Sequence, residues 1–182
     1  MRVIGLAGWS GAGKTTLLSK LIPELTGRGL SVSTVKHAHH AFDIDQPGKD
    51  SYVHRQAGAT EVLISSSRRY ALVHELRDEP EAQLEQLLER LARVDLVVVE
   101  GFKRAPHPKI EVHRAANGRP YLFPELPGIV ALASDAEPPD TLAIPAWHLE
   151  DISGIADAAL SHALSLSDTR LRLLAEPGSG PT

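Results

Sequence analysis

The sequence predicts an α/β fold with a doubly wound, mainly parallel sheet and flanking helices. Short apolar runs that suit buried strands alternate with amphipathic helical stretches, and a Gly-rich turn directly follows the first run. The stretch 102–126 contains four prolines and one strand-like run, which predicts a loop-rich β excursion. In folds of this class, ligands bind beyond the carboxyl ends of the strands.

Residue spacing predicts the individual elements. Residues 2–7 suit a buried strand, and apolar residues at helical spacing predict a helix over 15–28 that stops at Gly29. Further strands are expected at 30–35, 61–65, 70–75, 94–99, 109–113, 128–133 and 145–149, and further helices at 50–58, 80–93 and 152–166. Because the pattern fades after Asp168, we predict one domain over 1–168 and a flexible tail over 169–182.

Length and composition limit the class of protein. The chain has 182 residues, of which 42% are hydrophobic, and this is enough for one packed core. Lys and Arg number 19 against 23 Asp and Glu, so we expect neither nucleic-acid nor membrane binding. Disulfides and cysteine zinc sites are excluded because there is no cysteine. The apolar run at 3–7 is too short for a signal segment or a membrane span, and a cytoplasmic protein is predicted.

Residues 8–15, Gly-Trp-Ser-Gly-Ala-Gly-Lys-Thr, match the phosphate-loop pattern G-x-x-x-x-G-K-[ST] between a predicted strand and helix. Glycines let backbone N–H groups converge on phosphates at a helix N-terminus. A lysine at this position contacts the β- and γ-phosphates, and the following hydroxyl ligates Mg²⁺. We therefore expect a purine nucleoside triphosphate and Mg²⁺ to be held by Gly8, Ser10, Gly11, Ala12, Gly13, Lys14, Thr15 and Thr16. The alternative is a Gly-rich turn before an ordinary helix.

A triphosphate site also needs a carboxylate that orients the metal. Glu100 follows the apolar strand 94–99 and is the first candidate, and Gly101 permits close approach of the backbone to a ligand. Asp50 is the second candidate for a metal or water role, with a helix cap as the alternative. With Lys14, these two acids are the predicted catalytic residues. Asp95, at the other end of the strand, is expected to be structural.

Several motifs beyond the phosphate loop carry a family resemblance. They are Lys-His-Ala-His-His at 36–40, Phe-Asp-Ile-Asp at 42–45, Pro-Gly-Lys-Asp-Ser at 47–51, Ala-Gly-Ala at 57–59, Val-Glu-Gly-Phe-Lys at 99–103 and Pro-Lys-Ile-Glu-Val at 108–112. Over about residues 2–160 the chain resembles the molybdopterin-guanine dinucleotide biosynthesis adaptor proteins, the MobB family. The resemblance implies a P-loop protein that binds GTP, hydrolyses it weakly, and forms a homodimer. It also implies a molybdenum cofactor guanylyltransferase as partner, with molybdopterin as a further candidate ligand.

The sequence lacks the Asn-Lys-x-Asp guanine box of common GTPases. Asp135 follows a predicted core strand, and its carboxylate suits the N1–H and N2–H groups of guanine. A turn residue is the alternative. Guanine selectivity therefore rests mainly on the resemblance.

Three histidines, His37, His39 and His40, precede Asp43 and Asp45 in a polar loop. Within the resemblance, these histidines are expected to donate hydrogen bonds to the nucleotide or the pterin partner. A solvated loop and a permanent metal site are the other interpretations.

Lys103, Arg104 and Lys109 around His107 predict a basic surface patch near a second phosphate-bearing molecule, or else a solvated face. Two other functions share the phosphate loop. One is a small-molecule kinase that binds its acceptor hydroxyl near Asp50, and the other is a sensing module that binds nucleotide without hydrolysis.

Overall fold

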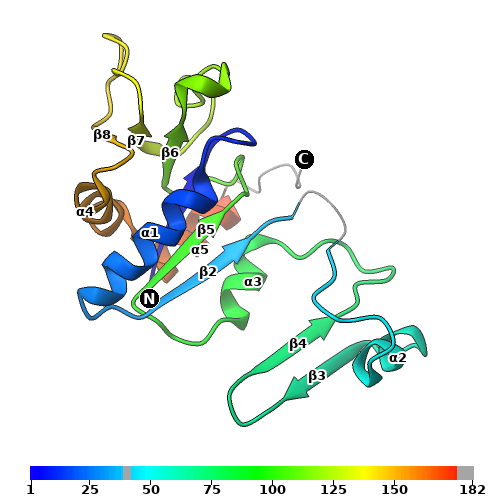
Figure 1. Cartoon of the computed structure of the whole chain (residues 1–182). Coiled ribbons are helices and arrows are strands. Elements are labelled where there is room, and N and C mark those ends of the chain that lie inside the picture. Colours follow the sequence, from blue (N-terminus) through cyan, green and yellow to red (C-terminus); the bar gives the residue numbers. More distant parts are fainter. Residues whose placement is uncertain (39–41, 176–182) are drawn as a thin grey trace. The chain divides into compact units, whose positions relative to one another are not determined.

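The computed structural model describes residues 1–38 and 42–175, and the chain divides into two compact units (Figure 1). The first unit comprises Met1–His37 and Gln83–Thr182, and the second comprises Ala38–Ala82. The sequence predicts a single domain over 1–168, and that assignment stays a prediction.

A seven-stranded sheet forms the centre of the described part of the first unit, with the order β2-β5-β1-β6-β7-β8 and every pair on this path parallel. Its strands are β1 (Arg2–Ala7), β2 (Val32–Lys36), β5 (Leu96–Glu100), β6 (Lys109–His113), β7 (Ile129–Ser134), β8 (Ala146–His148) and β9 (Leu164–Ser165). Strand β9 pairs antiparallel with the beginning of β1. The predicted doubly wound, mainly parallel sheet is confirmed.

Helices cover both faces of this sheet. α1 (Lys14–Gly27) and α4 (Ile152–His162) pack on one face, and α3 (Leu84–Arg90) and α5 (Leu166–Ala175) pack on the other. In Figure 1, α5 lies behind the sheet and is drawn fainter. Successive side chains of a strand point to opposite faces, so β5 divides its residues between the two cores. Val98 packs with α1 and α4, whereas Val97 and Val99 pack with α3 and α5.

The order of the strands places the phosphate loop at a switch point. β5 lies on one side of β1 and β6 on the other, and both run parallel to it. The segments that follow β1, β5 and β6 therefore leave the sheet at the same edge, which is where ligands bind in doubly wound folds.

Two predicted boundaries were wrong at the C-terminal side. The helix expected over 152–166 ends at His162, and a further helix, α5, continues to Ala175, where a tail was expected from 169 onward. Thr169 and Leu173 are buried because they share one face of α5, and Leu173 packs with the α3 core. The rest of the predicted tail, 176–182, lies outside the described residues. The helix expected over 80–93 is likewise shorter, and a capping box at Gln83 sets its start.

The second unit consists of a short helix and a hairpin. α2 (Asp50–Gln56) precedes β3 (Glu61–Ser65) and β4 (Tyr70–His74), which pair antiparallel. Arg55 on α2 forms ion pairs with Asp43, Asp45 and Glu75, at 2.9, 3.2 and 2.5 Å. These carboxylates raise the pKa of Arg55 above its usual range, and that of Asp43 is lowered, chiefly by the backbone N–H of Asp45 and then by Arg55. The ion pairs connect the loop, the helix and the hairpin of this unit.

Candidate nucleotide-binding site

The loop from Gly8 to Gly13 connects β1 with α1, as predicted. Gly11 and Gly13 have φ angles of 79° and 93°, a region that residues with a Cβ rarely adopt. Gly13 is the N-cap of α1 and supplies no side-chain acceptor, so the first N–H groups of the helix are available to an external anion. This backbone fits a phosphate group.

Lys14 lies over the loop. Its Nζ donates to the carbonyl oxygens of Gly8 and Trp9, each at 3.0 Å. Burial lowers the pKa of Lys14 below its usual value, while the nearby Glu100 carboxylate opposes this shift. The lysine and the acid that the sequence singled out therefore act on one another electrostatically.

Glu100 is the last residue of β5 and is 8% exposed. It lies opposite Leu6 of β1 and Lys36 of β2, and the Lys36 Nζ is 3.8 Å from its Oε1. The backbone turns sharply after it, because Gly101 and Phe102 have φ angles of 99° and 48°. A carboxylate at this edge, with the hydroxyl of Thr15 at the start of α1, supplies the oxygen donors that Mg²⁺ prefers.

His37 follows β2 beside this turn. Its backbone N–H donates to the Glu100 carbonyl at 2.8 Å, and its ring centroid lies 5.0 Å from that of Phe102. A Cβ on Gly101 would lie 2.6 Å from the Cβ of His37, so only glycine allows this approach. The predicted donors His39 and His40 lie outside the described residues.

Asp50 begins α2 and so belongs to the second compact unit. Its proposed metal or water role stays a prediction. Within residues 1–38 and 42–175, no three histidine or acidic side chains are grouped closely enough to hold a metal ion.

Asp135 follows β7 at the same edge as the phosphate loop. Its Oδ1 accepts a hydrogen bond from the backbone N–H of Ala115 at 2.7 Å, at the start of the 3₁₀ turn η1 (Ala115–Asn117). One of the two carboxylate oxygens of Asp135 therefore already accepts a hydrogen bond from within the protein. Its role in guanine recognition stays a prediction.

Sequence reasoning missed a segment that contacts the phosphate loop, residues 114–123. Asn117 Nδ2 donates to the Ser10 carbonyl at 2.9 Å, and Trp9 Nε1 donates to the Pro120 carbonyl at 2.8 Å. A Cβ on Gly13 would lie 3.2 Å from Nη2 of Arg114. Only the strand order could have indicated this contact, because residues 114–123 follow β6, the strand that pairs with β1.

The basic patch predicted around His107 was wrong in part. Lys109 and His107 are both fully buried, and Lys109 Nζ donates to the carbonyls of Ala105 and, at 2.9 Å, His107. Burial lowers the pKa of Lys109 to about 8. Lys103 instead lies over the Trp9 ring, 5.0 Å from its centroid.

Comparison with known proteins identifies the family. The family model described as molybdopterin guanine dinucleotide synthesis protein B, MobB, matches residues 3–135. The chain belongs to the MobB family. The matched range begins in β1 and ends at Asp135, so it includes the phosphate loop and Glu100.

Relatives of known name agree with this membership. A molybdopterin-guanine dinucleotide biosynthesis adapter protein of Escherichia coli is 42% identical over 158 residues, which span 85% of this chain and 89% of the relative. One from Haemophilus influenzae is 44% identical over 126 residues, 68% of each chain.

Solved MobB structures have the same fold. A crystal structure of molybdopterin-guanine biosynthesis protein B is 30% identical and superposes with a TM-score of 0.70, covering 87% of this chain and 97% of the other. The MobB homologue of Bacillus stearothermophilus superposes with a TM-score of 0.64 at 24% identity, covering 93% of this chain and 98% of the other. At this identity the likeness supports the fold alone.

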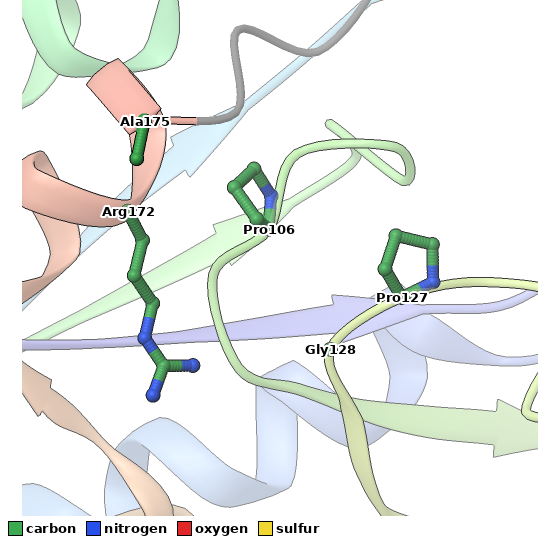
Figure 2. Close-up of a pocket in the computed structure, with 5 residues that line it drawn as sticks. All are labelled: Pro106, Pro127, Gly128, Arg172 and Ala175. Atoms are coloured by element: carbon green, nitrogen blue, oxygen red, sulfur yellow. The ribbon is translucent and has the colours of Figure 1, made fainter.

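A pocket of about 300 Å³ in this MobB family member lies apart from the phosphate loop. Figure 2 shows Pro106, Pro127, Gly128, Arg172 and Ala175 around it. Its lining residues precede β6 and β7 or come from the end of α5, whereas the phosphate loop follows the carboxyl end of β1. No helix in the described part of the chain is long and apolar enough to span a bilayer.

Proposed function

We propose that this protein binds GTP with Mg²⁺ at residues 8–16 and acts as an accessory protein when GMP is attached to molybdopterin. The observation that carries the proposal is the glycine loop with a free helix N-terminus, Lys14 above it and Glu100 beside it. Family membership supports the biosynthetic role, because relatives are named adapter proteins of molybdopterin-guanine dinucleotide biosynthesis. A cytoplasmic location is part of the proposal.

The residues of the site have distinct proposed roles. The loop amides and Lys14 bind the phosphates, and the Thr15 hydroxyl and Glu100 carboxylate hold the metal. Bound Mg²⁺ would neutralise charge on the phosphate oxygens. Lys14 would exchange its two carbonyl contacts for phosphate oxygens, which are stronger acceptors because they are charged. Asp135 would accept from guanine, and the roles that the sequence predicts for Asp50 and for the histidines at 37, 39 and 40 stay predictions.

We propose slow hydrolysis, which suits an accessory protein. No glutamine in the loop or in the described segments that follow β5 and β6 positions a water molecule. The partner would be a molybdenum cofactor guanylyltransferase, and molybdopterin is a further candidate ligand.

A homodimer is proposed as the functional form. The hairpin of the second unit presents Leu63, Tyr70 and Leu72 on one face, and these residues are 64%, 73% and 49% exposed to solvent. Large exposed apolar groups on a two-stranded sheet favour association, since such a hairpin is marginal alone.

Titration of GTP and ATP with MgCl₂ into the wild type and Lys14→Ala tests the proposal. The variant should bind GTP more weakly by about 1.5 to 3 kcal/mol, because charge-assisted phosphate contacts are lost. Lys20→Ala is the matched control, since Lys20 lies on the same helix and pairs with Glu150 on the surface. Equal affinity of Lys14→Ala and wild type contradicts the placement of the phosphates.

Product analysis separates the proposal from its alternatives. Release of inorganic phosphate that rises when the guanylyltransferase is added supports the adaptor, and Glu100→Gln should reduce it most at limiting magnesium. A phosphorylated small molecule would indicate a kinase. Tight binding with no phosphate release would indicate a sensing module.

A further inference from the structure

Arg114 lies against the phosphate loop at the start of α1. It directly follows β6, which neighbours β1, so both segments leave the same edge of the sheet. A Cβ on Gly13 would lie 3.2 Å from Nη2, 3.5 Å from Nε and 3.7 Å from Cζ of Arg114. Three guanidinium atoms are therefore packed over the last glycine of the loop, next to the helix N-terminus that offers its amides to an anion.

The backbone that carries Arg114 is held on both sides. On the loop side, Asn117 donates to the Ser10 carbonyl at 2.9 Å and Trp9 donates to the Pro120 carbonyl at 2.8 Å. On the sheet side, the N–H of Ala115 donates to Asp135 at 2.7 Å. These contacts fix the backbone that carries Arg114, which lowers the cost of ordering this segment when a ligand binds.

Within the described residues the guanidinium of Arg114 forms no ion pair and no hydrogen bond, although the residue is half-buried. The other half-buried arginines of the described chain donate hydrogen bonds, Arg2 to the Leu160 carbonyl at 2.9 Å and Arg55 to the Glu75 carboxylate at 2.5 Å. A half-buried cation without a counter-ion is unfavourable, and an anion at the adjacent helix N-terminus would remove that cost.

The neighbouring charges do not replace such an anion. Glu150 is the one acid whose lowered pKa reflects Arg114 within the described part of the chain, but Lys20 is the main cause and forms its ion pair, at 2.6 Å. Lys103 and Arg119 lie over the Trp9 ring, at 5.0 and 5.6 Å from its centroid.

We propose that Arg114 is a nucleotide-contacting residue that donates to phosphate oxygens of the triphosphate on the loop. The inference rests on the proposed function, and it adds a cation supplied by the same chain beside Lys14. A guanidinium presents several N–H donors in a planar fork, which matches two phosphate oxygens at once. Lysine in its place would keep the charge but lose the paired hydrogen bonds.

Calorimetric titration of GTP with MgCl₂ into the intact chain tests this role. Arg114→Ala should raise the Kd about tenfold or more, and Arg114→Lys should recover part of the loss. Arg170→Ala is the matched control, because it removes a half-exposed arginine of α5 that pairs with Glu89 of α3, and its Kd should equal that of wild type. The melting temperature without nucleotide reports whether each variant folds, and Arg114→Gln replaces Arg114→Ala if the alanine variant does not.

The outcomes separate this inference from the proposed function. If wild type binds GTP, Lys14→Ala loses binding and Arg114→Ala or Arg114→Gln stays within about twofold of wild type, the role of Arg114 is overturned and the proposed function stands. If wild type itself does not bind GTP, both fail. A loss in the Arg114 variants with an unchanged ligand-free melting temperature, and partial recovery with lysine, supports the inference.

Discussion

Buried ionisable side chains gather on β6 and in the residues just before it. Lys109 donates to two backbone carbonyls of the preceding loop, and Glu111 accepts from two backbone amides of the following segment. His107 differs, because within the described residues neither ring nitrogen has a hydrogen-bond partner. Gly5 makes room for this ring, since a Cβ there would lie 2.5 Å from its Nε2. An imidazole in such a place is costly to charge.

Acid should destabilise the protein through His107. Burial, and to a lesser extent the charge of Lys109, lowers the pKa of His107 from 6.5 to about 3. Because the folded value is the lower one, the unfolded chain binds more protons between these pH values, and stability falls as pH decreases through that window. Urea unfolding at pH 7 and pH 4 should show that wild type loses up to about 3 kcal/mol more than His107→Leu.

An exposed histidine provides the control for this measurement. His54→Leu removes an exposed imidazole from α2 and should keep the wild-type dependence on pH. The same acid-induced loss in His107→Leu and wild type would mean that His107 does not titrate as described.

At the scale of elements, the site depends on how the 114–123 segment is attached to the sheet. Glu111 lies in the middle of β6, 1% exposed, and its carboxylate accepts from the N–H groups of Leu122 and Phe123 at 2.7 and 2.8 Å. Burial raises the pKa of Glu111, and the two donors oppose this. This carboxylate fixes the far end of a segment whose near end contacts the phosphate loop through Asn117.

Glu111→Gln should loosen that segment. A glutamine offers one acceptor oxygen and an NH₂ group, so one of the two backbone N–H groups loses its partner, at a cost of about 1 to 3 kcal/mol. Hydrogen exchange at Leu122 and Phe123 should become faster, and GTP affinity should fall as a secondary effect. Glu125→Gln, an exposed change in the same connection, is the control, and unchanged exchange in Glu111→Gln would exclude this anchoring role.

Strong apolar patterns allowed several elements to be predicted with their bounds, and weak ones did not. β1, β3 and β6 have the predicted bounds. Helix α5 was missed because its buried face has few apolar residues among charged ones. Lys109 was predicted to lie in a basic surface patch because Lys103, Arg104 and His107 are close to it in the sequence. In the structure it begins a strand that is buried on both faces.

The positions of the phosphate loop, Lys14 and Glu100 at one edge of the sheet could be predicted because a local motif and an apolar strand mark them, and their roles stay predictions. Arg114 and Asn117 could not, because their approach to the loop depends on the pairing of β1 with β6, which periodicity does not encode.

At the scale of the whole molecule, the two units have different surfaces. The first has apolar cores on both faces of the sheet, and Leu171 and Leu174 on α5 are exposed outside them. In the second, Leu63 and Leu72 lie directly opposite one another across the hairpin and both are exposed, with Tyr70 on the same face. An exposed cross-strand pair of this kind gains stability only when something covers it.

Leu72→Glu should therefore disrupt the proposed homodimer. In a twofold interface the substitution appears twice, and burying each carboxylate costs several kcal/mol, so the dimer Kd should rise about a hundredfold or more. Sedimentation velocity over a range of concentrations measures this shift. Leu171→Glu is the matched control, because Leu171 on α5 is 66% exposed in the first unit and its charge should leave the mass unchanged. A wild-type chain that sediments as a monomer would contradict the homodimer itself. A Leu72→Glu chain that dimerises like wild type would mean that the contact between copies lies elsewhere.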